Sequence, residues 1–318
     1  MGIRKLDADN ILNFLNFLVP ILFTLYILSY FLTGLGGAIK LAVTLVPVLV
    51  IINVLASLRE KGLYPRFGRK ANYVVAGVYI ALCILVSVYM NLVFDDITYV
   101  RMGSYITLDV VVGVIALVLV MEYARRCHFT LFCLNLFLMF YAICGWIFPG
   151  LFRHAGVSVR RVLTLCSIEL DTGVFSSLSQ LALTLIASFL LLSAIAYGFG
   201  CQESLIRASR KIASKSVYGV PETAAISSFV IATVSGSGAA NAAITGSFTI
   251  PLMKRHGFPS VTAAAVETAT SIGGQLMPPL MGISAFIMCD LLGVTYFDVI
   301  ARGVIIGIIY YLGVAFAI

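Results

Sequence analysis

Two short stretches in the C-terminal third of this 318-residue chain combine glycine with oxygen-bearing side chains. The first stretch is Ser235-Gly-Ser-Gly-Ala-Ala-Asn241, and the second is Thr270-Ser-Ile-Gly-Gly-Gln275. Neutral hydroxyl groups and carbonyl oxygens can coordinate a hard cation, but they cannot carry a proton at physiological pH. The two stretches therefore predict a cation site, with sodium favoured over protons as its ion.

Glu267 lies three residues before the second stretch. A carboxylate in a membrane segment is costly, and it is a functional candidate for that reason. Three roles remain open for it: a structural anchor bonded to neighbouring backbone, serine or threonine groups, a cation or proton site, or a position at the membrane interface.

Other chemistry finds less support in the sequence. A hydrolase with Ser235 or Ser237 as nucleophile would need a nearby base, and the predicted spans contain neither His nor Lys, which leaves Glu267 as the only conceivable one. Gly236-x-Gly238 lacks the preceding strand and the following lysine of a nucleotide loop. The seven cysteines form no CxxC motif and no metal-ligand spacing. We therefore expect no enzyme activity and no cofactor other than a coupling sodium ion.

The first stretch is expected at the tip of a helical hairpin over Thr223–Met253. Its arms, Ala224–Val234 and Ala239–Met253, would be about 17 and 22 Å long at helical rise, and the first is too short to cross about 30 Å of hydrocarbon. Basic residues flank both outer ends. A hairpin that enters the membrane from the cytoplasm and returns explains this pattern, because exposed backbone at that depth must be buried in protein or line a wet cavity.

The second stretch predicts a break in a helix over Ser260–Cys289. Two glycines and then Pro278 and Pro279 remove helix propensity and backbone donors together. Unwinding frees carbonyl oxygens, and a broken helix beside a hairpin tip is an arrangement in which secondary transporters bind a cation and a substrate.

The composition identifies the rest of the chain as membrane helix. Hydrophobic residues make up 61% and charged residues only 11% of the sequence, which excludes a soluble domain, a disulfide scaffold and a nucleic-acid-binding domain. Six further apolar runs predict spans: Ile11–Phe31, Leu41–Leu58, Ala71–Phe94, Met102–Met121, Phe129–Phe152 and Thr172–Gln202. The fold class is therefore an all-α, multi-span membrane bundle with a re-entrant hairpin and a discontinuous helix.

Basic residues in the loops predict the orientation. The positive-inside rule is met by most loops if the N-terminus is cytoplasmic, and residues 203–215 then form an amphipathic helix on the cytoplasmic face. One segment disagrees, because Arg153, Arg160 and Arg161 fall on the outer side. Asp109 is expected at the outer membrane interface.

The stretches GSGAANAAITGSFTIPLMKRHGF and AAAVETATSIGGQLMPPLMGISAFIM resemble the large membrane subunit of tripartite ATP-independent periplasmic (TRAP) transporters, in the branch that fuses the small and large subunits. The resemblance implies a sodium-driven elevator-type importer in the cell inner membrane. It would accept organic anions such as carboxylates from a periplasmic solute-binding protein, with membrane lipid as its surroundings and no nucleic-acid partner.

The resemblance also implies a set of site residues. The implied sodium ligands are Ser235, Gly236, Ser237, Asn241, Thr270, Ser271, Gly273 and Gly274. Gln275, Pro278 and Glu267 are expected next to the substrate. The family commonly has Ser-Thr-Gly-Gly where this chain has Ser271-Ile272-Gly-Gly, so the threonine hydroxyl is missing unless Thr270 or a backbone carbonyl replaces it.

Three regions are expected: residues 1–165 as a small-subunit-like scaffold, 166–216 as a connecting span with the amphipathic helix, and 217–318 as the first repeat of the transport domain. Only one hairpin and one broken helix are found, followed by a 16-residue apolar run, Gly303–Ile318, that is short for a span. We therefore expect the first half of an inverted-repeat fold that needs its missing second half to transport. A non-transporting fragment or a channel component are the alternatives.

Overall fold

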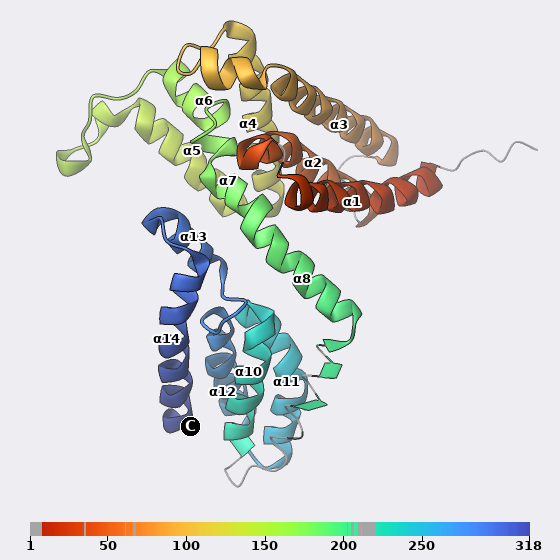
Figure 1. Ribbon diagram of the computed structural model, residues 1–318, viewed down its shortest axis with the longest axis vertical. Coiled ribbons are helices and arrows are strands. Elements are labelled where there is room, and N and C mark those ends of the chain that lie inside the picture. The colour runs from red at the N-terminus through yellow and green to blue at the C-terminus, as the bar shows by residue number, and fades with distance from the viewer. Residues whose placement is uncertain are drawn as a thin grey trace, which may run out of the picture. The chain divides into compact units, whose positions relative to one another are not determined.

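The computed structural model describes residues 8–34, 36–60, 62–65, 68–201, 203–204, 207–208, 211 and 220–318. Every regular element within these ranges is a helix (Figure 1). The chain divides into two compact units, Met1–Thr184 and Leu185–Ile318. The three functional regions expected from the sequence remain a prediction.

The first unit has seven α-helices among its described residues: α1 (Ala8–Thr33), α2 (Gly37–Glu60), α3 (Arg69–Leu92), α4 (Thr107–Cys127), α5 (Phe129–Ile143), α6 (Val159–Ser167) and α7 (Ser177–Leu181). Short π- or 3₁₀-helical turns lie between or after them: η1 (Asp96–Val100), η2 (Gly145–Ile147), η3 (Gly150–Phe152), η4 (Gly173–Phe175) and η5 (Ala182–Ile186). Helix α2 packs against α1, α3 and α4. Val54, Val86 and Met90 are almost fully buried in the resulting core.

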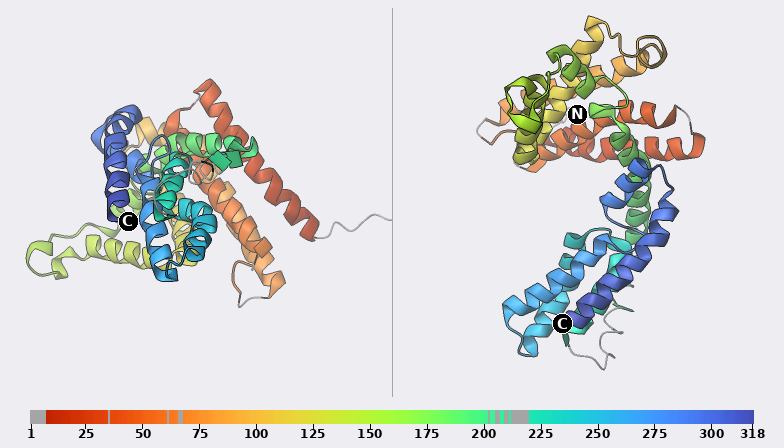
Figure 2. Two further views of the ribbon diagram at one scale, coloured as in Figure 1. Left: turned by 90° about the horizontal axis from the view of Figure 1, so that it is seen from below. Right: turned by 90° about the vertical axis from the view of Figure 1, so that its left-hand side faces the viewer.

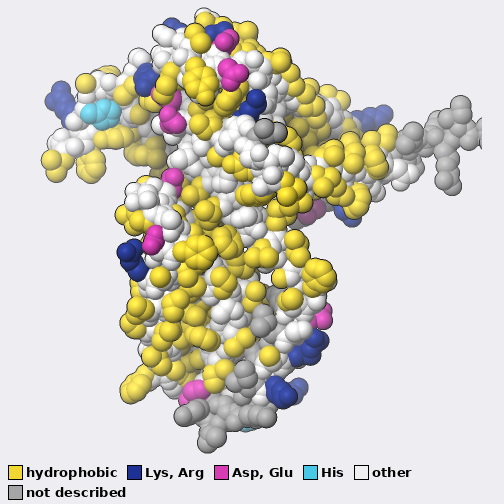
Figure 3. Space-filling model, in the orientation of Figure 1, with side chains coloured by type: hydrophobic (Ala, Val, Ile, Leu, Met, Phe, Trp, Pro, Cys, Tyr) yellow, Lys and Arg dark blue, Asp and Glu magenta, His cyan; other side chains and the backbone are white. Residues whose placement is uncertain are grey.

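Among the residues that the structure describes, six segments are long and apolar enough to cross a membrane: Asn10–Thr33, Gly37–Glu60, Arg69–Leu92, Thr107–Cys127, Gly173–Gly198 and Tyr296–Ala317. Between 6 and 44% of each apolar stretch is buried within the protein. Large apolar side chains consequently cover much of the surface in view (Figure 3). Such a surface requires lipid around it, which confirms the predicted all-α, multi-span membrane fold.

Two details of the first unit bear on the sequence prediction. The apolar run Phe129–Phe152 is not one long helix, because α5 ends at Ile143 and short 3₁₀ turns follow around Gly145, Pro149 and Gly150. Asp109 lies near the start of α4, and its side chain is fully buried, while its expected place at the membrane interface remains a prediction. Its carboxylate accepts hydrogen bonds from the Tyr89 hydroxyl and from the Ile106 backbone N–H, and it pairs with Arg101 at 3.4 Å.

The second unit contains the predicted hairpin and broken helix. Its helices are α8 (Ala187–Gly198), α10 (Val220–Ser235), α11 (Gly238–Arg255), α12 (Ser260–Ile272), the 3₁₀ turn η6 (Gly273–Gln275), α13 (Ile283–Leu292) and α14 (Tyr296–Ala317). Helices α10, α11 and α12 contact one another pairwise and lie side by side (Figures 1 and 2). The turn η6 contacts α10, α11 and α14, so the break in the helix lies inside this unit.

The hairpin arms are longer than the sequence indicates. Helix α10 has 16 residues and α11 has 18, or about 24 and 27 Å at helical rise, because α10 begins at Val220 and α11 continues to Arg255. Pro221 lies in the first turn of α10, where its missing N–H removes no helical hydrogen bond. Both arms remain shorter than about 30 Å of hydrocarbon.

The prediction of a short last helix over Gly303–Ile318 is wrong. Helix α14 begins at Tyr296 and has 22 residues, the length of a membrane span. Thr295 caps its N-terminus and forms a reciprocal capping box with Asp298. The amphipathic helix predicted over 203–215 falls largely on residues outside the described ranges.

The predicted orientation can be tested at the two ends of α3. Arg69 is its first residue, and Asp96 follows its last turn with a side chain that is 54% exposed. In a background without native cysteines, Arg69→Cys should react with a membrane-impermeant maleimide only from the cytoplasmic side and Asp96→Cys only from the outside. The opposite labelling pattern in intact cells and inverted vesicles would reverse the topology.

Candidate functional site

The hairpin turn is a two-residue connection that only glycine allows. Gly236 has a φ of +58°, and a side chain there would place its Cβ 2.7 Å from the carbonyl oxygen of Leu280. Ser237 caps α11, because its Oγ accepts a hydrogen bond from the Ala240 N–H at 3.3 Å. The turn therefore packs directly against the unwound segment between α12 and α13, as the sequence predicts.

Asn241 joins the two arms of the hairpin to the end of α12. It lies in the first turn of α11 and is fully buried. Its Nδ2 donates hydrogen bonds to the carbonyl oxygens of Ser228 (3.2 Å) and Ser271 (3.4 Å). Its Oδ1 is buried without a hydrogen-bond partner in the part of the chain that the structure describes. A buried amide oxygen of this kind is unusual in a folded protein and is a suitable ligand for a hard cation.

The paired glycines of the break make room for side chains from two other elements. A Cβ on Gly273 would lie 2.5 Å from a ring carbon of Tyr311 in α14. A Cβ on Gly274 would lie 3.2 Å from both Ser235 Oγ and Asn241 Cβ. Glycine at both positions therefore lets α14 and the hairpin approach the same short piece of backbone.

Tyr311 is a site residue that the sequence analysis missed. It is 6% exposed and packs with Ala232 and Met277, and its hydroxyl is buried with no hydrogen-bond partner among the described residues. The signal was present as spacing, because Gly303, Gly307 and Tyr311 follow one another at four-residue intervals and share the buried face of α14.

Glu267 is held in a cage of hydroxyl groups. It is 2% exposed, and the Ser271 hydroxyl donates to its Oε1 at 2.9 Å. The hydroxyls of Thr245 and Thr249, one turn apart on α11, contact its two carboxyl oxygens. Gly246 permits this approach, since a Cβ there would lie 3.2 Å from Glu267 Cγ. The carboxyl group therefore fastens α12 to α11.

The hydroxyl of Ser228 connects the Glu267 cage with the neighbourhood of Asn241. It lies 3.2 Å from Thr245 Oγ1 and 3.3 Å from Thr270 Oγ1. The Ser228 backbone carbonyl in turn accepts a hydrogen bond from the Asn241 side-chain amide. Hairpin and broken helix thus share one continuous polar network inside an apolar unit.

Comparison with known proteins identifies the family. Residues 114–318, well over half of the chain, match the family model described as "Tripartite ATP-independent periplasmic transporter, DctM component". The chain belongs to this family. The members of this family are membrane components of TRAP transporters, and they are not enzymes.

A curated relative is similar to part of this DctM-family chain. The "Uncharacterized protein y4mL" of Sinorhizobium fredii (strain NBRC 101917 / NGR234) is 35% identical over 91 residues, which is 29% of this chain. The match spans about a fifth, 21%, of that relative's length. No solved structure matches the chain.

The structure brings most of the expected sodium ligands of this DctM-family chain close together. Ser235, Gly236, Ser237 and Asn241 lie at the hairpin turn, where Ser235 and Asn241 face Gly274 and Gly236 faces the Leu280 carbonyl. Thr270 and Ser271 are buried beside them, whereas Ile272 is 49% exposed. On the broken helix, the buried hydroxyls are therefore those of Thr270 and Ser271, and they donate to the Glu267 carbonyl and carboxylate.

The residues expected next to a substrate do not lie together. Glu267 is enclosed in its hydroxyl cage, and Pro278 lies in the link before α13. Gln275 instead lines a mainly apolar cavity of about 190 Å³ that lies between the link, α13 and α14. Arg302 of α14 lines the same cavity, together with apolar side chains such as Met288 and Ile306.

The packing at the break predicts the effect of adding one methyl group. Gly273→Ala forces a Cβ into the Tyr311 ring and should lower the free energy of unfolding by about 1–3 kcal/mol, as overpacking does in buried sites. Gly77→Ala in α3 is the matched control, because no atom lies within 4 Å of the added Cβ. Denaturation in detergent measures both. An equally large loss in the control would contradict the role of the Tyr311 contact.

The Glu267 cage predicts a coupled set of substitutions. Thr245→Val and Thr249→Val should each lower the free energy of unfolding by about 1–3 kcal/mol, because each leaves a buried carboxyl oxygen short of a partner. In a Glu267→Leu background the same substitutions should lower the free energy of unfolding by much less. Thr268→Val is the control, since the Thr268 hydroxyl is exposed and bonds only the Ala264 carbonyl. If the losses in free energy of unfolding are additive in the double-mutant cycle, the hydroxyl groups do not stabilise the Glu267 carboxyl group.

Proposed function

We propose that this DctM-family chain is the permease component of a sodium-coupled secondary transporter that imports organic anions delivered by a periplasmic solute-binding protein. The observation that carries the proposal is a pair of buried oxygen atoms, Asn241 Oδ1 and the Tyr311 hydroxyl, that have no hydrogen-bond partner in the part of the chain that the structure describes. The Tyr311 hydroxyl lies against Gly273, and the Asn241 side chain lies against Gly274. Uncharged oxygen donors beside unwound backbone suit a hard monovalent cation better than a proton.

The family supports the remaining parts of the proposal. TRAP transporters, by the description of the family, are tripartite, independent of ATP and periplasmic, which implies a periplasmic solute-binding partner. Import against a gradient without ATP requires a coupling ion, and the neutral site described above supplies a place for one. Sodium coupling, location in the inner membrane and an elevator-type movement are parts of this proposal.

The cavity beside Gln275 supports an organic anion as substrate. Its single guanidinium group, from Arg302, can bind a carboxylate through charge-assisted hydrogen bonds. Its mainly apolar wall suits a substrate with a hydrocarbon body. A carboxylate with an apolar chain is therefore the substrate class that we propose.

Sodium binding can be measured on the full chain without knowing the substrate. Sodium that binds only the folded state raises stability by about 2.7 kcal/mol when its concentration is a hundred times the dissociation constant. The thermal midpoint in detergent should therefore rise with sodium chloride but not with choline chloride at equal ionic strength. Asn241→Ala and Tyr311→Phe should each weaken sodium binding about tenfold, since each removes one oxygen ligand.

Tyr310→Phe provides the matched control, because the Tyr310 hydroxyl donates to the Ala269 carbonyl at 2.5 Å instead of facing the site. This variant should lose some stability in every salt and keep the sodium-dependent rise. If sodium chloride raises the thermal midpoint neither of the parent chain nor of any variant, the proposal of sodium coupling through this site is wrong.

A further inference from the structure

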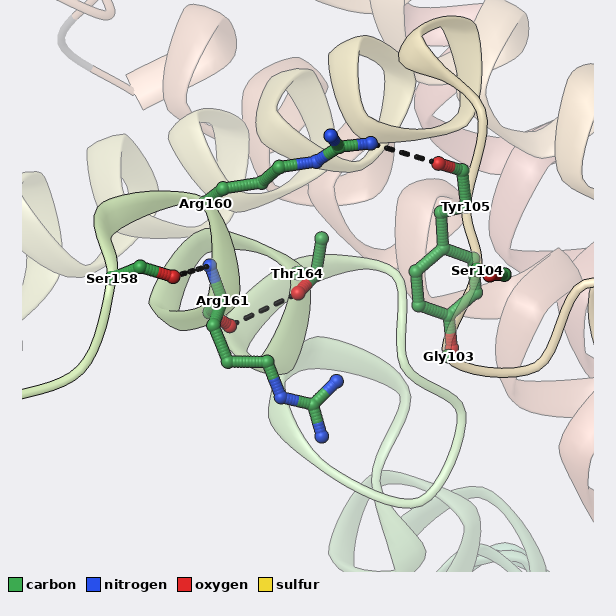
Figure 4. A pocket seen from close by; sticks show the side chains of 7 residues that line it. All are labelled: Gly103, Ser104, Tyr105, Ser158, Arg160, Arg161 and Thr164. Carbon is green, nitrogen blue, oxygen red and sulfur yellow. Dashed lines mark hydrogen bonds between the residues drawn. The ribbon is translucent and has the colours of Figure 1, made fainter.

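A second site lies in the first unit, in a polar cavity of about 320 Å³ (Figure 4). It is formed by the loop that precedes α4 and by the first turns of α6. Its lining residues are Gly103, Ser104, Tyr105, Ser158, Arg160, Arg161 and Thr164. None of these belongs to the hairpin, the broken helix or the cavity beside Gln275, so the proposed function does not use them.

Two guanidinium groups face this cavity from adjacent positions of α6. Arg160 donates to the carbonyl oxygen of Tyr105 at 3.0 Å, and it has no ion-pair partner among the residues that the structure describes. Arg161 extends to the other side and pairs with Glu169 at 3.5 Å (Figure 4). An arginine has five N–H donors, so one carbonyl contact leaves most of the Arg160 donors available. The charged residues of the lining are therefore both cationic, with the carboxylates of Glu169 and Asp171 near it, and Arg160 keeps unused hydrogen-bond donors.

The cavity opens where a membrane span begins. Tyr105 lies two residues before Thr107, the first residue of the candidate span α4. Three large apolar side chains next to the lining residues in the sequence are about half exposed: Ile106, Leu108 and Val159. In a membrane protein such side chains contact acyl chains, and long arginine side chains at the end of a span can reach the lipid phosphates.

We infer that this cavity binds the phosphate group of an anionic phospholipid. Arginine suits a phosphate because its planar guanidinium donates two parallel hydrogen bonds to the oxygens. Ser158 and Ser104 add hydroxyl groups to the same lining. The site also accounts for two of the three arginines that violate the positive-inside rule in the predicted topology, since Arg160 and Arg161 then have phosphate as their partner.

Glu169 distinguishes binding from a purely structural role of the arginines. Its carboxylate competes for Arg161 and does not line the cavity. Glu169→Gln removes that competing charge, so it should strengthen phosphate binding. A role limited to holding α6 in place would instead be weakened by loss of the ion pair.

Native mass spectrometry of the full chain in detergent tests the inference. The parent chain should retain added dioleoyl phosphatidylglycerol in preference to dioleoylglycerol, which has the same acyl chains and no phosphate. Arg160→Gln with Arg161→Gln should weaken retention at least about tenfold, the effect of losing a charge-assisted hydrogen bond. Arg153→Gln is the matched control, since this exposed arginine of the same segment does not line the cavity. Glu169→Gln should increase retention.

Equal retention of both lipids by the parent chain, or unchanged retention in the double variant, would overturn the site. Thermal midpoints confirm that each variant is folded before its lipid content is compared. Soluble glycerol 3-phosphate provides the second arm: displacement of phosphatidylglycerol at equal concentration would assign the cavity to a free phosphate ester and overturn the lipid.

Discussion

A broken helix in a membrane protein has backbone N–H and C=O groups without helical hydrogen bonds, and such groups cannot be exposed to lipid. This constraint governs the structure of the second unit. The segment between α12 and α13 loses helical hydrogen bonds over Gly273 and Gly274 and over the two prolines that follow. Other protein groups must take up these backbone atoms. The Asn241 amide binds the Ser271 carbonyl, and the Tyr296 hydroxyl donates to the Pro279 carbonyl at 2.6 Å. The hairpin and α14 are therefore required by the break itself.

Close approach of three elements follows from that requirement. Gly236, Gly273 and Gly274 each lie where a Cβ would meet another segment within 2.5–3.2 Å. Small residues let helices approach closely in membranes, where the hydrophobic effect drives no association between helices. In this unit the same glycines also admit polar groups: Tyr311 from α14 and Ser235 from the hairpin. Packing and site formation thus depend on the same positions.

The sequence predicted the fold where its pattern is local. The tract Ser235–Asn241 predicts a turn, and the paired glycines and prolines predict a break in a helix. Both features are present. Helix ends were less predictable, because they depend on capping: Thr295 and Asp298 start α14 seven residues before the predicted Gly303. The burial of Asp109 was not predictable, because its partners, Tyr89 and Arg101, come from a neighbouring helix and the loop after it.

The site residues, too, were predictable where their signal is local in the sequence and not where it depends on contacts between helices. The hairpin and break residues were found through glycine and polar side chains in an apolar setting, a signal that is visible in one dimension. Tyr311 was missed because it lies in a helix that is apolar throughout, and only contact with Gly273 shows its importance. The hydroxyl cage of Glu267 was one of three open roles, since the sequence cannot show that Thr245 and Thr249 share a face with it.

The polar groups of the second unit separate into two kinds by whether their hydrogen bonds are complete. The Glu267 carboxyl is bonded by three hydroxyls on two helices, so it already has what a buried carboxyl group needs, and it acts as a fastening between α11 and α12. Asn241 Oδ1 and the Tyr311 hydroxyl have no such partners in the described residues. A buried polar atom without a partner costs about 1–3 kcal/mol, and a protein retains that cost where the atom serves a ligand. Because Tyr311 comes from α14 and Asn241 from the hairpin, a cation bound between them would tie these two elements together. Binding of the ion would then change how firmly α14 is attached to the hairpin, which is the kind of link that couples an ion gradient to movement of a substrate site.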